Sequence, residues 1–130
     1  MNVTKKNETR VGQSEYAPYI TGLLARERER RRRMQLRRSE AMEVARQAAS
    51  LLRQQFGVVR VRVFGSVLRP HRFHERSDID LAVEGLPTGA YLKAWALLNG
   101  PGVEFEIDLV TSDECRSAIW DSAMREGVDV

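Results

Sequence analysis

The sequence predicts a mixed α/β (α+β) protein: a small mixed β-sheet packed by helices, preceded by a long N-terminal helix. Three observations lead to this fold class. Residues 19–56 contain no proline and a single glycine, Gly22, which is typical of a long helix. After this stretch, short β-rich segments appear in which apolar residues recur at every second position. Helical patterns and turn residues separate these segments, as expected for helices packed on a sheet.

The N-terminal half divides into a tail and a helix. Residues 1–18 are mostly polar, and we expect a flexible tail there. Residues 19–56 then form one long helix that is basic in its first part and amphipathic in its second, and Gly57 ends it as a C-cap. The apolar residues of the amphipathic part follow a helical spacing: Ala41, Ala45, Ala48, Leu52 and Phe56.

The arginine-rich run 26–38 has three interpretations. It can be a solvated helical face, a surface for an acidic protein partner, or a nucleic-acid contact. Nucleic-acid binding is the least favoured of these, because no aromatic residues are interleaved with the arginines.

Residues 57–130 alternate between strands and helices. Val59, Val61 and Val63 predict a strand that ends at Phe64, and Ser66 is a candidate N-cap for a short helix over 66–69. Further strands are expected over 78–83 and 103–110, and helices over 87–99 and 112–126. In the helix over 87–99, the apolar side chains expected on or near the buried side are Leu92, Trp95, Ala96 and Leu98.

Composition limits the classes of protein that fit. The chain has 130 residues, 42% hydrophobic and 30% charged, which suits one globular domain. No apolar run approaches the roughly 20 residues that cross a bilayer, and the N-terminus has no secretory pattern. The single Cys115 has no partner for a disulfide. We therefore expect a cytoplasmic protein with no membrane contact.

Charge is distributed unevenly along the chain. Residues 1–62 contain 15 Lys and Arg against 6 Asp and Glu, whereas residues 63–130 contain 6 against 12. The acidic half includes Asp78 and Asp80, which flank one isoleucine. Two carboxylates at this spacing on a strand point to the same face and repel each other. Such a pair predicts a bound cation.

A third carboxylate and a glycine-serine turn complete the expected site. Asp108 lies on the next predicted strand, which can stand beside the first and bring three carboxylates together. Oxygen ligands of this kind suit Mg²⁺. Gly65 allows a close approach of the backbone to an anion, and Ser66 adds a hydroxyl at the start of a helix. An acidic metal site beside a phosphate-binding turn predicts a nucleoside triphosphate ligand.

These segments resemble the minimal nucleotidyltransferases (MNT family) of the DNA polymerase β superfamily. The resemblance covers residues 42–130 and rests on Gly65-Ser66, on Ser77-Asp78-Ile79-Asp80-Leu81 and on Ile107-Asp108-Leu109-Val110, with the closing Arg125-Glu126-Gly127-Val128 similar to the usual family ending. It implies a minimal nucleotidyltransferase domain over 57–130. The sequence differs from the family pattern in one place. The loop between Ser66 and Asp78 is one residue longer than usual, with Pro70 where glycine is common, which puts the contacts of this loop to the triphosphate in doubt.

The resemblance implies two-metal nucleotidyl transfer from ATP. Asp78, Asp80 and Asp108 would be the catalytic carboxylates and would hold two Mg²⁺ ions. Gly65, Ser66, Arg69 and Ser77 would contact the nucleotide. Many members of the family are antitoxins paired with a HEPN-domain ribonuclease toxin, and some transfer AMP to a tyrosine of that toxin. The resemblance therefore implies a protein adenylyltransferase acting on a HEPN partner within a hetero-oligomer.

Two alternatives remain open from the sequence. The chain can be a binding module that neutralises a toxin by contact without catalysis, or an RNA-binding protein that uses the arginine-rich helix.

Overall fold

The computed structural model describes the backbone of residues 2–130 and the side chains from Tyr16 onward. It forms two compact units, one ending at Arg33 and the other spanning Met34–Val130. The elements are, in chain order, α1 (Asn2–Phe56), β1 (Arg60–Phe64), the short 3₁₀ helix η1 (Gly65–Leu68), β2 (Ile79–Glu84), α2 (Tyr91–Leu98), β3 (Ile107–Thr111), α3 (Ser117–Glu126) and β4 (Val128–Asp129). The mixed α+β class is therefore confirmed.

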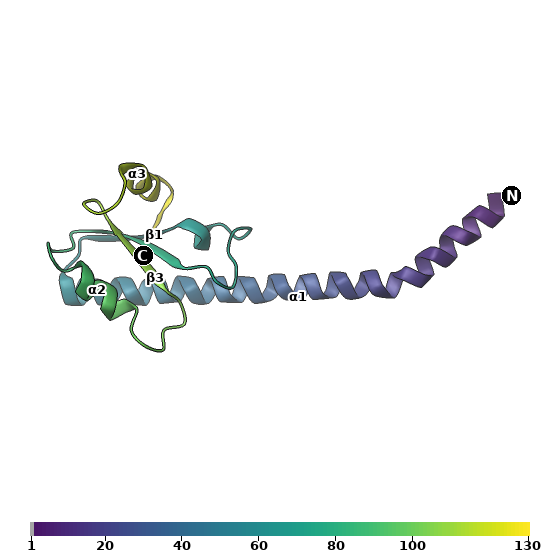
Figure 1. The fold of residues 1–130 in the computed structure, drawn as a ribbon, viewed down its shortest axis with the longest axis horizontal. Helices are drawn as coiled ribbons and strands as arrows, with labels where there is room; N and C mark the ends of the chain where they lie inside the picture. The colour runs from purple at the N-terminus through teal and green to yellow at the C-terminus, as the bar shows by residue number, and fades with distance from the viewer. Residues whose placement is uncertain (1) are drawn as a thin grey trace. The chain divides into compact units, whose positions relative to one another are not determined.

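The strands form one four-stranded mixed sheet in the order β3-β2-β1-β4 (Figure 1). β1 runs antiparallel to both β2 and β4. β2 and β3 are parallel, and α2 provides the crossover connection that a parallel pair requires.

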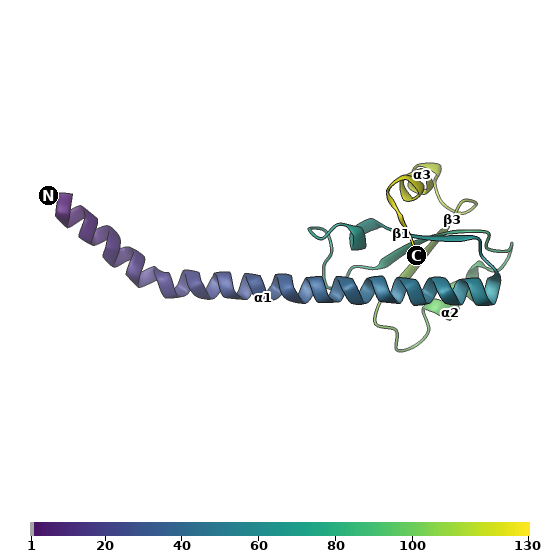
Figure 2. The same cartoon turned by 180° about the vertical axis from the view of Figure 1, so that it is seen from behind.

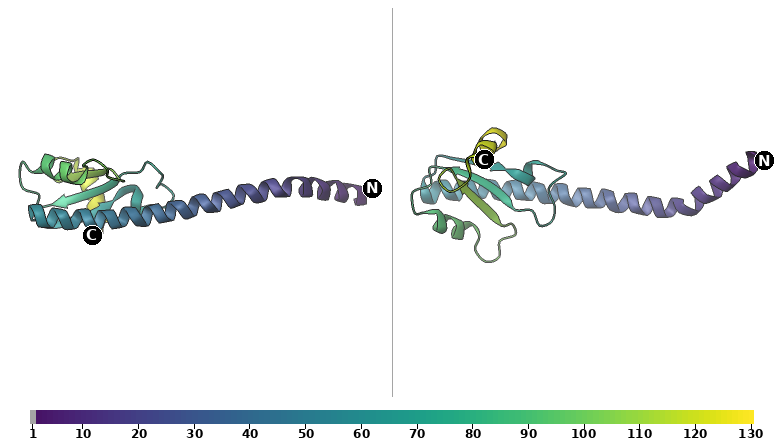
Figure 3. Two further views of the ribbon diagram at one scale, coloured as in Figure 1. Left: turned by 90° about the horizontal axis from the view of Figure 1, so that it is seen from below. Right: turned by 45° about the horizontal axis from the view of Figure 1, so that its top comes forward.

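One face of the sheet packs on the second half of α1. Figures 1, 2 and 3 show this teal part of α1 running alongside the strands. The helix contributes small side chains, so its backbone approaches the sheet closely. The buried residues on α1 are Ala41, Ala45, Ala48, Ala49 and Leu52, which confirms the predicted amphipathic pattern. They share one apolar cluster with Val61, Val63, Leu81 and Leu109 of the strands.

The other face of the sheet carries polar residues and α3. Along β1 and β2, alternate residues point away from the apolar cluster, and these include Arg62 and Asp80. Ala82 and Ala123 are fully buried but lie outside the main cluster, since α3 covers part of this second face. The candidate carboxylates are therefore on the face opposite α1.

The N-terminal prediction was wrong in one respect. α1 begins at Asn2, so residues 2–18 are helical where we expected a flexible tail. Pro18 lies inside the helix, where it removes one backbone donor and favours a bend. Figure 1 shows such a bend in the early, purple part of α1.

Several predicted elements are shorter in the structure. The third strand begins at Ile107 rather than at residue 103, and Ile107 is the register partner of Ile79, the first residue of β2. α2 begins at Tyr91 rather than at residue 87, since Gly89 adopts a positive φ of 82° that a helix excludes. α3 begins at Ser117, after a turn in which Cys115 donates to the carbonyl of Thr111.

The predicted buried side of α2 was also wrong in part. Ala94 and Leu98 are buried, but Leu92 is 76% exposed and Trp95 is 39% exposed. Ala96 is exposed as well. Apart from Lys93, this helix is apolar, so it provides little periodic contrast from which its buried face can be read. The sequence also gave no sign of β4, which has only two residues.

Candidate functional site

Asp80 and Asp108 stand side by side in the sheet. They are register partners on the parallel neighbours β2 and β3, so their side chains project from the same face of adjacent strands. Asp78 precedes the first residue of β2 and follows the same alternation two residues before Asp80. The three predicted carboxylates therefore come from one corner of the sheet.

Electrostatics support this proximity. The pKa of Asp80 is raised to about 6, first by burial and then by the negative charges of Asp108 and Asp78. The charge of Asp108 also contributes, after burial, to a raised pKa of Tyr91. The Tyr91 hydroxyl donates to the carbonyl of Leu109 at 2.7 Å and so joins α2 to β3 beside the carboxylates. Among the described residues, Asp78, Asp80 and Asp108 have no ion pair or hydrogen bond with a protein cation.

The glycine-serine turn lies directly against Asp80. Phe64, the last residue of β1, is the register partner of Asp80, and Gly65 follows it with a φ of 80°. A Cβ atom added to Gly65 would lie 3.2 Å from Cγ of Asp80 and would collide with its Oδ2. Glycine is required here both for the left-handed conformation and for the close approach.

Ser66 lies in the first turn of η1 but does not cap it. The 3₁₀ helix begins at Gly65 with Phe64 as its N-cap, and no side chain caps it, so the predicted capping role of Ser66 was wrong. The backbone oxygen of Ser66 accepts from the amide of Arg69 at 2.9 Å. Its hydroxyl makes no hydrogen bond to another described residue and remains available to a ligand.

Arg69 forms an ion pair across the same face. Its Nη2 lies 2.7 Å from Oε2 of Glu126 at the end of α3, and both side chains are partly exposed. An exposed pair of this kind contributes about 0–1 kcal/mol. A phosphate could therefore replace Glu126 as the partner of Arg69 at small cost.

Ser77 does not face the site. It is 8% exposed, and its hydroxyl accepts a hydrogen bond from the amide of His74 at 2.9 Å. The amide of Ser77 in turn donates to the carbonyl of His74 at 3.0 Å. Ser77 therefore holds the loop between Pro70 and Asp78 in shape, and its contact with a nucleotide stays a prediction. Phe73, buried in the apolar cluster, anchors the same loop.

Arg38 is a residue that the sequence did not indicate for this site. Its Nε donates at 2.6 Å to the carbonyl of Val67, which is the residue after Ser66. Arg37, its neighbour, lies over the ring of Phe105 at 4.4 Å and pairs with Glu104 at 3.6 Å. These two arginines make contacts within the Met34–Val130 unit, so the end of the run 26–38 is not a solvated face. In a run of similar arginines, nothing in the sequence marks Arg37 and Arg38 as the ones that make these contacts.

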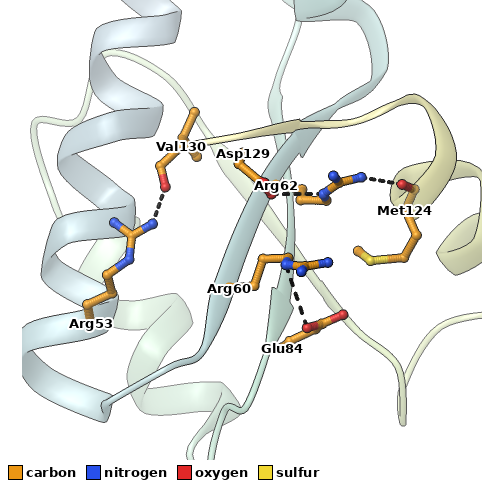
Figure 4. Close-up of polar contacts among 7 residues, drawn as sticks. All are labelled: Arg53, Arg60, Arg62, Glu84, Met124, Asp129 and Val130. Carbon is orange, nitrogen blue, oxygen red and sulfur yellow. Dashed lines mark hydrogen bonds and ion pairs between the residues drawn. The ribbon is translucent and has the colours of Figure 1, made fainter.

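The C-terminus is fixed to the sheet by arginines. Figure 4 shows Arg62 bonded to Asp129 and to the carbonyl of Met124, and Arg53 bonded to the carbonyl of Val130. The Arg62–Asp129 distance is 2.9 Å. Gly127 makes this return of the chain possible, because a Cβ atom there would lie 3.1 Å from the carbonyl oxygen of Val63. These contacts hold the end of α3, and with it Glu126, near Arg69.

The donor set suits a hard cation, although its side chains are not gathered around one point. Within residues described by the structure, no group of three or more His, Cys, Asp or Glu is close enough to hold a metal ion. Asp78 and Asp108 are exposed and Asp80 is half-buried. The exposed carboxylates can therefore rotate toward Asp80. Carboxylates that repel one another without a protein counter-charge are the ligands that Mg²⁺ prefers.

Comparison of the sequence with models of protein families and with curated proteins found no match. The resemblance to minimal nucleotidyltransferases therefore rests on the quoted motifs alone. Among the helices described here, none combines the length and apolar character that crossing a membrane would need.

Proposed function

We propose that this protein is a Mg²⁺-dependent nucleotidyltransferase that transfers AMP from ATP to a hydroxyl of a partner protein. One observation carries the proposal. Asp80 and Asp108 are register partners on parallel strands, and the Gly65 turn lies against the carboxylate of Asp80. An unpaired acidic corner beside a turn with a free hydroxyl is the arrangement expected for a metal-bound triphosphate.

The residues have distinct roles in this proposal. Asp78, Asp80 and Asp108 would hold two Mg²⁺ ions, which when bound would neutralise the triphosphate and lower the pKa of the attacking hydroxyl. Gly65 would admit the phosphates close to the backbone, and the Ser66 hydroxyl would donate to a phosphate oxygen. Arg69 would exchange Glu126 for the β- or γ-phosphate.

The transfer balances without any further reactant. The acceptor oxygen forms a bond to the α-phosphorus of ATP, and the bond between that phosphorus and the oxygen bridging to the β-phosphate breaks. Pyrophosphate leaves with the electron pair of the broken bond. The proton of the acceptor hydroxyl passes to the carboxylate of Asp108, which is exposed and unpaired among the described residues. The products are pyrophosphate and an adenylylated acceptor.

The acceptor and the setting come from the resemblance. We propose a tyrosine of a HEPN-domain ribonuclease toxin as the acceptor, which would make this chain an antitoxin. The reaction would take place in the cytoplasm, where ATP and such a toxin are both present.

The position of the label in ATP distinguishes nucleotidyl transfer from phosphoryl transfer and from neutralisation by contact. The purified protein is incubated with Mg²⁺ and a clarified extract of its host cells, with ATP labelled either at the α- or at the γ-phosphate. We expect one protein to become labelled with α-labelled ATP only when the purified protein is added, and the addition to put no label on that protein with γ-labelled ATP. The label should disappear in Asp80→Asn and persist in Asp113→Asn, which alters an exposed carboxylate at the far end of β3.

The opposite label pattern would indicate phosphoryl transfer and contradict the proposal. If the toxin is neutralised but carries no label, the protein is an antitoxin that acts by contact alone.

A further inference from the structure

The N-terminal unit carries an apolar stripe that no residue from Tyr16 onward covers. Five large side chains of α1 are between 44% and 64% exposed: Tyr16, Tyr19, Ile20, Leu23 and Leu24. Their spacing of three, one, three and one places them on one face of the helix. Isolated exposed apolar residues are ordinary, but a contiguous row of five on one helix face is typical of an interaction surface. We refer to these five residues as the Tyr/Leu stripe.

A cluster of positive charge follows the stripe directly. Residues 16–25 contain no charged side chain, and residues 26–33 contain six arginines and two glutamates. Both glutamates are already paired within the helix, Glu27 with Arg30 at 2.8 Å and Glu29 with Arg32 at 3.7 Å. The cluster therefore presents unneutralised arginines to any molecule that covers the stripe. We refer to residues 26–33 as the Arg cluster.

We propose that the Tyr/Leu stripe binds in an apolar groove of a partner protein, and that acidic residues beside this groove contact the Arg cluster. Anchors at i, i+3, i+4, i+7 and i+8 on a short helix match the way in which amphipathic helices bind grooves. The Arg cluster selects an acidic partner, because charge complementarity accelerates encounter and disfavours basic partners.

A second copy of this chain fits the surface less well. The stripe spans residues 16–24, little more than one heptad, whereas a coiled coil needs at least three. Its continuation on the same face is occupied by the ion-paired Glu27, Arg30 and Arg31. Pairing two copies would also bring two strongly basic helices together at the cost of their mutual repulsion.

A lipid surface also fits less well. Helices that lie on anionic membranes carry Lys or Arg on the face opposite their apolar residues. Opposite the Tyr/Leu stripe stand Pro18, Gly22 and Ala25 instead, and none of them is charged. The charge of this unit follows the stripe along the chain rather than facing it across the helix.

Docking of a partner here requires no nucleotide chemistry, so a failure of this proposal and a failure of nucleotidyl transfer are separate results. The test uses the full chain in its host cells, with a photo-crosslinking amino acid at position 20 or at position 25. Position 20 lies within the stripe, and position 25 lies on the opposite face of the same helix. The crosslinked protein is identified by mass spectrometry and then purified for binding measurements.

We expect position 20 to crosslink one acidic protein and position 25 to give little of the same adduct. In titrations with that purified protein, Ile20→Glu should weaken binding by tenfold or more, whereas the matched Ala25→Glu should change it by less than threefold. The affinity should fall as salt is raised, because the Arg cluster contributes. Since Ile20 is exposed, circular dichroism should show the same helix content in both variants.

Several results would overturn the proposal. These are the absence of any adduct, equal crosslinking from the two positions, an adduct formed only with a second copy of the chain, and binding to the captured protein that Ile20→Glu does not weaken. Co-sedimentation with phosphatidylserine-containing vesicles that Ile20→Glu abolishes would assign the stripe to a membrane and would also overturn it.

Discussion

Replacing Asp80 by asparagine should stabilise the protein when no metal ion is present. The side chain is half-buried and lies near two other carboxylates, so its negative charge is unfavourable in the folded state. Asparagine keeps the size and shape of the side chain but removes the charge. An ordinary surface aspartate would show no such gain.

The size of the effect follows from the pKa of Asp80, which the fold raises from 3.8 to about 6. At full strength this shift corresponds to about 3 kcal/mol. Solvent screens part of the repulsion at a half-buried position, so we expect about 1–1.5 kcal/mol. For a domain of this size, that gain corresponds to a rise in melting temperature of roughly 4–8 °C.

The pH dependence has a definite sign. Because the pKa of Asp80 is higher in the folded than in the unfolded state, the folded protein holds this proton more tightly. The wild-type protein therefore keeps the associated stability below about pH 4 and loses it as the pH rises through about 6. The advantage of Asp80→Asn should be small at pH 4, grow up to about pH 6 and stay constant above it.

Urea denaturation followed by circular dichroism, with a chelator present, measures this difference across the pH range. Asp113→Asn serves as the control, because it removes an exposed carboxylate at the other end of β3. If Asp80→Asn were less stable than the wild type at pH 7.5, or equally stabilised at every pH, burial and the neighbouring carboxylates would not disfavour the charge of Asp80 as we have argued.

Two substitutions and one deletion test the structural elements that hold the site in place. Gly65→Ala should destabilise the protein by roughly 1–3 kcal/mol and abolish ATP binding, because the new Cβ atom meets Asp80 at a backbone φ of 80°; unchanged stability in urea would place the turn elsewhere. Arg38→Ala should cost roughly 1.5–3 kcal/mol by removing a charged donor from the carbonyl of Val67. A loss below about 0.5 kcal/mol, the size of an ordinary surface change, would show that the contact is unimportant. Deleting residues 1–33 should leave a folded domain with undiminished ATP binding, since the second unit begins at Met34; loss of its circular dichroism signal would contradict that boundary.

The sequence was sufficient to predict the helices and strands whose apolar residues recur at a regular spacing. Val61 and Val63 alternate with arginines, and both are buried as predicted. Ala41 and Ala45 follow a helical spacing and pack on the sheet. The relation between Asp80 and Asp108 was also predictable, because similar patterns on successive strands joined by a helix favour a parallel pair.

Other features depend on contacts that no local pattern encodes. Ser77 resembles a site residue in sequence, but its burial is decided by the loop that follows Phe73. Arg38 is one of many arginines, and only the fold brings it to the carbonyl of Val67. β4 has two residues, and it exists because Arg62 and Gly127 hold the chain end against β1.

The central claim is that the corner formed by Asp78, Asp80 and Asp108 binds a metal-complexed triphosphate. Isothermal titration of the full chain with ATP, with and without Mg²⁺, tests it most directly. We expect binding that requires Mg²⁺, that is lost in Asp80→Asn and that survives in Asp113→Asn. Binding of ATP with the same affinity in Asp80→Asn, or in the absence of Mg²⁺, would contradict the claim.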